Sequence, residues 1–258
     1  MTRHETFATQ SIAEKDMVLA TDLDGTFLGG SDEERARFYN WIEGNRDRVG
    51  LIFVTGRDPG FVSDLTLRRG VPKPDYVIGD VGTTIAEMGP DHILAPIEAL
   101  EADIADVWGT NGAAVQAALS QIDGLSLQST GFRYRVSYDL DPAKFDRTAL
   151  DIIADLGLDA LISDNRFFDV LPKGVSKGPS LLRLLAHLSI DHRRTLVAGD
   201  TLNDLSMLAL GLPAVAVGGS EDALIEKVAS MDHVYAATEV GVSGIAKAIL
   251  HFELFPTH

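Results

Sequence analysis

Residues 17–26 read MVLATDLDGT, an apolar run followed at once by two acids, a glycine and a threonine. The continuous apolar stretch Met17–Ala20 favours a strand that is covered on both faces. Asp22 and Asp24 then lie at its carboxyl end, where open parallel sheets bind their ligands. Two carboxylates this close repel each other and attract a hard cation. Taken alone, a strand-to-helix turn with a capping aspartate also explains the stretch.

Apolar runs alternate with amphipathic stretches on both sides of this segment. Further buried strands are predicted at 51–54, 76–78, 195–198, 213–217 and 233–235. Helices are predicted at 33–47, 59–69, 177–188, 203–210, 221–229 and 241–252. Short apolar strands separated by helices are typical of a parallel sheet with helices on both faces. The sequence therefore predicts an α/β fold with a Rossmann-like parallel sheet as its core.

The pattern changes between residues 84 and 171. A hairpin is predicted around Gly89-Pro90, followed by helices at 98–108 and 112–121, strands at 125–129 and 132–138, a helix at 142–156, and strands at 158–162 and 167–171. Adjacent strands with hairpin signals predict an antiparallel sheet with helices on one side. We therefore expect a core built from residues 1–83 and 172–258, interrupted by an α+β insert of residues 84–171.

Three further motifs carry polar groups in the predicted core. Val54-Thr55-Gly56-Arg57 ends the second strand, and its hydroxyl and backbone amides can bind a phosphoryl oxygen. Lys177 lies where a helix begins, which is unfavourable for the helix macrodipole and so suggests an anionic partner. The stretch 199–204, GDTLND, follows another strand and offers more oxygen ligands. Each motif alone has an ordinary explanation as a turn, a solvated side chain or a helix start.

Taken together and in this order, Asp-x-Asp-Gly-Thr, Thr-Gly-Arg, Lys and Gly-Asp-x-x-Asn-Asp resemble the motifs of the haloacid dehalogenase (HAD) superfamily of phosphatases. The resemblance implies a HAD-like core in which Asp22 is the nucleophile and Asp24 the general acid and base, with Thr55 and Lys177 completing the catalytic set. It also implies that Mg²⁺ is the cofactor. The metal ligands would be Asp22, Asp24, Asp200 and Asp204, and the phosphate-binding residues Thr55, Gly56, Lys177 and Asn203.

The position and sequence of the insert narrow the resemblance. Thr55 follows Asp24 by 31 positions and Lys177 follows Thr55 by 122, so the insert lies between the second and third motifs, as in HAD phosphatases with a C2-type cap. Segments 80–83, 128–138 and 168–178 are similar to the sucrose-phosphate and mannosylfructose-phosphate phosphatase group. The implied substrate is a sugar or disaccharide phosphate. The expected substrate-binding residues are Gly82, Gln128, Arg133 and Lys173.

The cap segment 132–138 offers further candidates for sugar binding. On a strand over these residues, Arg133, Arg135 and Ser137 would share one face. For any one of these side chains, an ordinary place on the sheet surface explains it at least as well. Three alternatives to a sugar-phosphate phosphatase stay open. They are a broad-range phosphatase of small sugar phosphates, a phosphomannomutase-like phosphotransferase, and a binding module without turnover.

Composition limits the partners of the protein. The formal net charge of −16 disfavours nucleic acid and anionic membrane surfaces as partners. The chain has no cysteine, which excludes disulfides, thiolate zinc sites and cysteine nucleophiles and suits a cytoplasmic protein. The segment 1–16 lacks the apolar core of a signal peptide, and no apolar run is long enough to span a bilayer. The sequence leaves open whether the protein is a monomer or a dimer.

Overall fold

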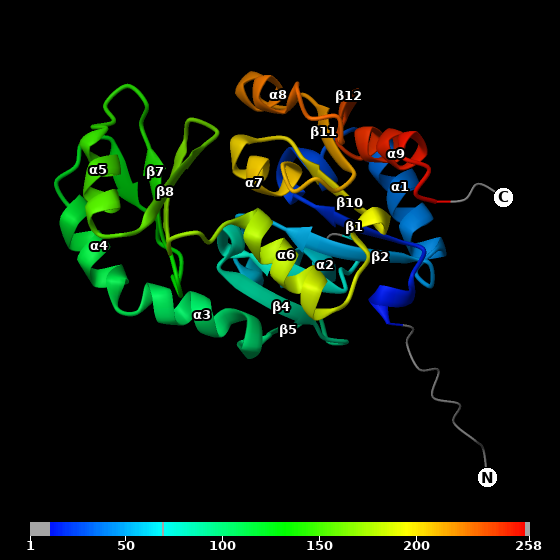
Figure 1. Ribbon diagram of the computed structural model, residues 1–258, viewed down its shortest axis with the longest axis horizontal. Helices are drawn as coiled ribbons and strands as arrows, with labels where there is room; N and C mark the ends of the chain where they lie inside the picture. Colours follow the sequence, from blue (N-terminus) through cyan, green and yellow to red (C-terminus); the bar gives the residue numbers. More distant parts are fainter. Residues whose placement is uncertain (1–10, 69, 256–258) are drawn as a thin grey trace, which may run out of the picture.

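The computed structural model describes residues 11–68 and 70–255, which form two sheets with their own helices. The larger sheet has the strand order β12-β11-β10-β1-β2-β3-β4-β5, and the smaller one the order β6-β7-β9-β8. Figure 1 shows the smaller sheet and its helices as a separate body beside the larger one, joined to it through α3 (Glu98–Trp108) and the chain that leads into α6 (Lys177–His187). The predicted fold class, an α/β core with an α+β insert, is confirmed.

The larger sheet is parallel from β12 to β3. Its parallel strands are β1 (Met17–Thr21), β2 (Val49–Val54), β3 (Tyr76–Gly79), β10 (Thr195–Gly199), β11 (Ala214–Gly218) and β12 (Val234–Val240). The chain proceeds outward from β1 through β2 and β3, and later returns to add β10 on the other side of β1. The strand order therefore reverses beside β1, the position at which open α/β sheets bind ligands.

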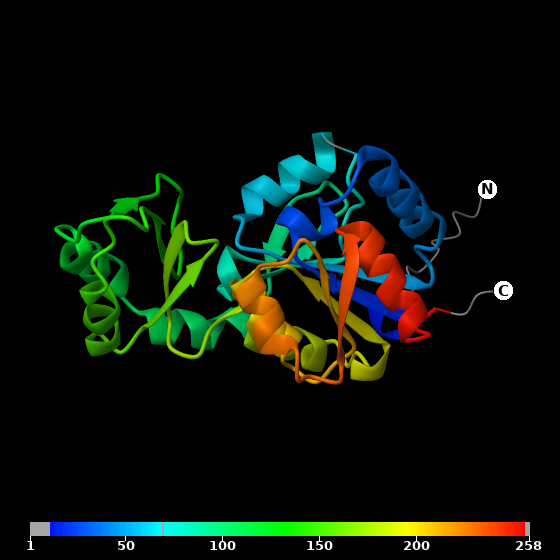
Figure 2. The same ribbon diagram turned by 90° about the horizontal axis from the view of Figure 1, so that it is seen from above.

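Helices cover both faces of the larger sheet. One face packs against α1 (Asp32–Gly44), α2 (Pro59–Arg68) and α9 (Val242–His251), with Ile42, Val62 and Ile245 fully buried. The other packs against α6, α7 (Leu205–Leu208) and α8 (Asp222–Val228), with Leu181, Met207 and Leu224 fully buried. These layers are seen from above in Figure 2. Because both faces are covered, the strands between them are continuously apolar, as the sequence predicts.

The smaller sheet is antiparallel. It consists of β6 (Leu125–Leu127), β7 (Val136–Leu140), β8 (Asp159–Ser163) and β9 (Phe167–Leu171). Helices α4 (Asn111–Leu119) and α5 (Thr148–Asp155) cover one of its faces, where Val115, Ile153 and Phe168 are fully buried. We call this body, from α3 to β9, the cap. Its other face is turned toward the carboxyl ends of the core strands.

The sequence boundary at residue 84 falls inside the larger sheet and is corrected by the structure. Strands β4 (Thr84–Met88) and β5 (Leu94–Pro96) form the predicted hairpin, but β4 pairs antiparallel with β3 and so extends the core sheet. The hairpin signal is correct, and its sheet could not be read from local sequence because it depends on β3. Among the described residues, no helix is long and apolar enough to cross a bilayer.

Candidate active site

The site is built where β1 and β10 end side by side. The two strands pair in parallel, with Thr21 opposite Ala198. The backbone N–H of Asp22 donates to the carbonyl of Ala198 at 2.9 Å, which fixes the first acid of the motif against β10. Asp200 follows β10 by one residue. The two motifs, 178 positions apart in the sequence, therefore meet at the point where the strand order reverses.

Gly25 allows the carboxylate of Asp200 to approach the loop after β1. Its φ of +79° lies in the left-handed region, and a Cβ at this position would stand 2.1 Å from Oδ2 of Asp200. The hydroxyl of Thr26 donates to Oδ1 of the same carboxylate at 2.7 Å. Gly25 and Thr26 of the first motif thus position the carboxylate of Asp200, which belongs to the last motif.

Lys177 joins the third motif to the other two from the first turn of α6. Its side chain is fully buried, and its ammonium donates to Asp22 Oδ1 at 2.7 Å, Asn203 Oδ1 at 2.8 Å and Asp204 Oδ1 at 2.6 Å. Burial alone would lower the pKa of Lys177, but the Asp204 and Asp22 carboxylates outweigh burial and raise it. The lysine is therefore a fixed cation below the site.

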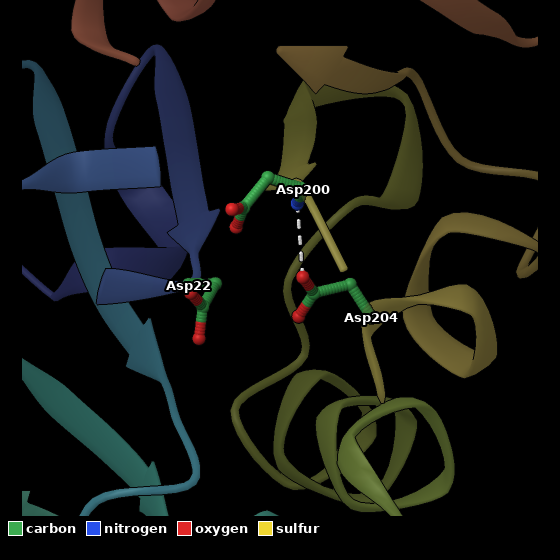
Figure 3. A group of neighbouring side chains, drawn as sticks. All are labelled: Asp22, Asp200 and Asp204. Carbon is green, nitrogen blue, oxygen red and sulfur yellow. Dashed lines mark hydrogen bonds between the residues drawn. The ribbon is translucent and has the colours of Figure 1, made fainter. Parts of the chain in front are cut away.

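Three carboxylates surround this cation on one side. One oxygen each of Asp22, Asp200 and Asp204 lies within 4.8 Å of the others, and Figure 3 shows the three side chains converging from β1, β10 and the start of α7. Burial, and then the other two acids, raise the pKa of Asp22 well above its ordinary value, while Lys177 opposes the shift. Burial and the nearby Asp204 raise the pKa of Asp200 to about 7. Such crowded acids are stabilised in their ionised form by a bound cation.

The three acids differ in how many carboxylate oxygens are left free to bind a metal ion. Asp204 is fully engaged, because Lys177 occupies Oδ1 while the N–H groups of Asp200 and Thr201 donate to Oδ2 at 2.9 and 3.0 Å. Asp22 and Asp200 each have one oxygen bonded and Oδ2 without a hydrogen-bond partner among the described residues. Carboxylate oxygens of this kind are suitable ligands for a hard divalent cation. Asp204 is better placed to support the loop.

The second acid of the first motif faces a different partner. Arg57 donates from Nε to Asp24 Oδ2 at 2.7 Å and from Nη2 to Oδ1 at 3.0 Å, a two-pronged ion pair that is half exposed. Thr55 is buried at the end of β2, and its hydroxyl accepts the N–H of Arg57 at 3.1 Å. The Thr-Gly-Arg motif thus places an arginine on Asp24, a contact that the sequence did not assign.

A cavity of about 410 Å³ extends from these groups to the cap. Its core wall includes Asp22, Asp24, Gly56, Arg57, Asp200 and Asn203, and its cap wall includes Gln128, Thr130, Asp164, Arg166, Phe167 and Asp169. The cap wall therefore combines hydrogen-bonding groups with one aromatic ring, as a site for a sugar requires. Lys177 and Thr55 lie below the cavity floor.

The four predicted substrate-binding residues have different positions. Gln128 lines the cavity, and its amide donates to Asp139 at 3.0 Å. Arg133 lies outside the cavity wall, precedes β7, and pairs instead with Glu101 of α3 at 2.8 Å. Lys173 is exposed. Gly82, with φ of +104°, packs against the backbone of Ser176, where a Cβ would come within 2.4 Å.

A buried cluster at the junction of core and cap was only partly anticipated. Arg135 of the cap donates to Asp80 of the core at 3.1 and 3.0 Å and to Asp169 of β9 at 3.1 Å. Ser137 also bonds to Asp169, so Arg135 and Ser137 do point the same way, as alternation predicts. Burial raises the pKa of Asp169, and Arg135 opposes the shift. The resemblance marked the segment 80–83 but not the pairing of Asp80 with Arg135, because the two residues are 55 positions apart.

This fold, with acids from the first and last motifs around a buried lysine, defines a HAD-like hydrolase. Among solved structures, the sucrose-phosphatase of Synechocystis sp., determined with sucrose and phosphate, superposes with a TM-score of 0.83 at 24% identity and covers 93% of this chain and 98% of that one. A haloacid dehalogenase-like hydrolase from Bacillus subtilis superposes with a TM-score of 0.65 at 14% identity, over 96% and 95% of the two chains.

The family model for sucrose-6F-phosphate phosphohydrolase matches residues 15–253, and the chain belongs to this phosphatase family. It is 28% identical to mannosylfructose-phosphate phosphatase of Agrobacterium fabrum, over 93% of this chain and 98% of that protein. It is 38% identical to glucosylglycerol-phosphate synthase of Pseudomonas anguilliseptica over 92% of this chain, but spans only 31% of that protein. It spans 62% of a probable sucrose-phosphatase of Arabidopsis thaliana, at 30% identity.

Proposed function

We propose that this protein is a Mg²⁺-dependent phosphatase that hydrolyses the phosphomonoester of a small glycoside through an aspartyl phosphate formed on Asp22. The observation that most supports the proposal is the position of Asp22. It lies at the floor of a cavity of about 410 Å³, with Oδ1 held by the buried Lys177 at 2.7 Å. A carboxylate fixed in this way by one oxygen keeps the other available for in-line attack on phosphorus.

In the first step, Oδ2 of Asp22 attacks phosphorus, and the bond from phosphorus to the sugar oxygen breaks. Asp24 gives its proton to the departing oxygen. In the second step, water attacks phosphorus and passes a proton to Asp24, the bond from phosphorus to Asp22 breaks, and inorganic phosphate leaves. Lys177 and the backbone at Thr55 and Gly56 stabilise the charge on the phosphoryl oxygens.

Asp24 must leave Arg57 for the first step. In the structure both of its oxygens accept from the guanidinium, so neither is placed to give a proton to a substrate. The phosphate of an incoming substrate is a competing anion for the same guanidinium, which also lies over the ring of Phe61 at 4.7 Å. Substrate binding would therefore free Asp24 at the moment when its proton is needed.

The donor set fits Mg²⁺, which takes oxygen ligands and keeps several of its waters. Asp200 would hold the ion through its free oxygen and Asp22 through the oxygen that is not the nucleophile, with the carbonyl of Asp24 as a third protein ligand and with Asp204 and Asn203 keeping Lys177 and the loop in place. When bound, the ion neutralises charge on the transferring phosphoryl group. The space beside Gly25, which a Cβ would fill and which the carboxylate of Asp200 occupies, supports this assignment.

The substrate class rests on what the relatives share. Their names refer to glucosylglycerol phosphate, mannosylfructose phosphate and sucrose phosphate, and each of these is a glycoside that carries a phosphomonoester. The chain spans a third of the synthase, so the synthase reaction itself is not carried over. We further propose that the cap selects the glycoside, with Gln128, Asp169 and the ring of Phe167 in contact with it.

The test is release of inorganic phosphate from a panel of phosphates with and without Mg²⁺. The panel contains the three glycoside phosphates above, trehalose 6-phosphate and simple hexose phosphates. Mg²⁺-dependent preference for one glycoside phosphate is expected. Equal, weak release from all of them would instead favour a broad-range phosphatase, and phosphate appearing on a second sugar would favour a phosphotransferase.

A further inference from the structure

Glu221 uses its side chain in an unexpected way. It occupies the N-cap position of α8, where a side chain normally accepts an N–H from the first helical turn, yet its carboxylate makes no such bond. Instead Oε2 accepts the N–H of Leu202 at 2.7 Å, and Oε1 accepts the N–H of Asp164 at 3.0 Å. One core side chain therefore binds two backbone segments that are remote from its own helix.

The two segments belong to opposite walls of the cavity. Leu202 lies in the core loop between Asp200 and Asp204, and the N–H of Glu221 itself donates to the carbonyl of Asp200 at 2.9 Å. Asp164 lies in the turn between β8 and β9 of the cap. Both Asp164 and Asn165 have positive φ, at 54° and 46°, as a tight two-residue hairpin turn requires. Figure 2 shows this hairpin extending from the cap toward α8.

The cap thus contacts the core through two kinds of bond. The ion pair of Arg135 with Asp80 is buried, with both side chains 6% exposed, so separating its charges is costly. The bond from Asp164 to Glu221 is exposed and joins a backbone N–H to a carboxylate, so water can replace either partner. The first is suited to stay formed when the cap moves, and the second to open and close.

We propose that Glu221 is a positioning residue that fastens the β8–β9 turn of the cap to the 200–204 loop, so that closing the cap and ordering that loop occur together. The consequence for catalysis rests on the proposed phosphatase function, but the fastening itself does not. Because the carboxylate satisfies one N–H on each side, opening the cap leaves Glu221 holding the loop alone. Closing the cap adds the second bond and limits the movement of both segments.

The distance between cap and core tests the fastening directly. The chain has no cysteine, so Asp155→Cys in the cap and Lys227→Cys on α8, both exposed positions, can carry spin labels without competing sites. In Glu221→Gln, the amide keeps the size of the side chain but only its oxygen can accept. The distance distribution is expected to broaden toward longer values in Glu221→Gln. It should stay as in the parent protein for Glu226→Gln, an exposed glutamate on the same helix.

Kinetics supply the second readout. Glu221→Gln should lower kcat/KM for the preferred glycoside phosphate by about tenfold, as loss of one hydrogen bond to a charged acceptor predicts, with Glu226→Gln within about twofold of the parent. An unchanged distance distribution in Glu221→Gln would overturn the proposal whatever the activity. If the parent protein releases no phosphate, the proposed function fails, and the distance measurement still decides whether Glu221 fastens the cap.

Discussion

The core end and the cap end of the cavity differ in how their polar groups are held. In the core, Asp22 and Asp204 follow strands of the larger sheet, Lys177 begins a helix that packs on that sheet, and the lysine ammonium bonds to the two carboxylates at 2.7 and 2.6 Å. In the cap, Gln128 directly follows β6 and Asp169 lies on β9, and both bond to partners within the cap or at the junction. The core end is therefore specified by a single sheet, whereas the cap end depends on how two bodies meet.

The largest difference in turnover between core and cap variants should come from Asp22→Asn. An amide is not a nucleophile for phosphorus, so turnover should fall by at least ~10⁴-fold, far more than for any single cap variant. Phosphate release from purified protein measures this, and circular dichroism checks that the fold is kept. Asp139→Asn, which changes an exposed cap acid next to Gln128, is the matched control and should stay within about threefold. Residual turnover of the Asp22 variant within a factor of ten of the parent would contradict the mechanism.

Lys177→Met should be nearly as damaging and should also affect stability. It removes a fully buried cation from beside Asp22 and Asp204, which costs about 3–5 kcal/mol in unfolding free energy when the remaining charges stay ionised. The cost should be larger at pH 8 than at pH 5.5, because protonation of carboxyls with raised pKa, such as Asp22, relieves it at the lower pH. Urea unfolding at the two pH values measures the difference. If Lys177→Met cost the same unfolding free energy at both pH values, the ionised carboxylates would not depend on Lys177 for their stabilisation, which would contradict this prediction.

Two cap arginines sharpen the comparison inside the cap. Arg135→Met leaves Asp80 and Asp169 buried without their cation and should cost about 3 kcal/mol in stability and raise KM. Arg133→Met breaks a pair in which the arginine is 40% exposed and Glu101 only 4%, but Glu101 keeps the N–H of Ile85 and water can replace the guanidinium, so the cost should be smaller than for Arg135→Met, about 1 kcal/mol. Comparing the stability and KM of the two variants therefore distinguishes Arg135, at the core–cap junction, from Arg133, which lies outside the cavity wall. Equal effects of the two would refute that distinction.

The smallest predicted effect is a change of the melting temperature with pH and with Mg²⁺. The folded pKa of Asp200 is raised to about 7 from the ordinary 3.8, so its neutral form is favoured by folding. This stability is fully present below pH 3.8 and is lost as pH rises through about 7. The melting temperature of the metal-free protein should therefore fall between pH 6 and pH 8. Saturating Mg²⁺ should remove much of the fall, since the ion favours the ionised acids.

The Asp200→Asn variant provides the control for this titration. It should show a smaller fall in melting temperature over the same pH range, because the group that titrates is gone. A melting temperature of the parent that is flat or rises from pH 6 to pH 8 without metal would contradict the assignment. So would a pH dependence that Mg²⁺ leaves unchanged.

The same contrast explains what the sequence could predict. Apolar strands predicted the fold class, and the shared edge of parallel strands predicted that the motifs of Asp22 and Asp204 meet. Lys177 was placed with them only by the resemblance to the HAD motifs, and the structure shows it bonded to both acids. Arg133 does not line the cavity, because its guanidinium pairs with Glu101 of α3, a contact that strand alternation could not predict. The ion pair of Asp80 with Arg135 and the contacts of Glu221 could not be predicted, since they join the core to the cap.

The most direct test of the proposed mechanism is to trap the aspartyl phosphate on Asp22. In Asp24→Asn, an aryl phosphate with a good leaving group should still phosphorylate Asp22, while hydrolysis slows for lack of a base. Borohydride reduces the acyl phosphate to an alcohol, and peptide mass spectrometry then locates the reduced residue. The account predicts substrate-dependent reduction at position 22, and none in the Asp22→Asn, Asp24→Asn double variant. Turnover by the parent with no modification at position 22 under these conditions, or with modification at another acid, would contradict it.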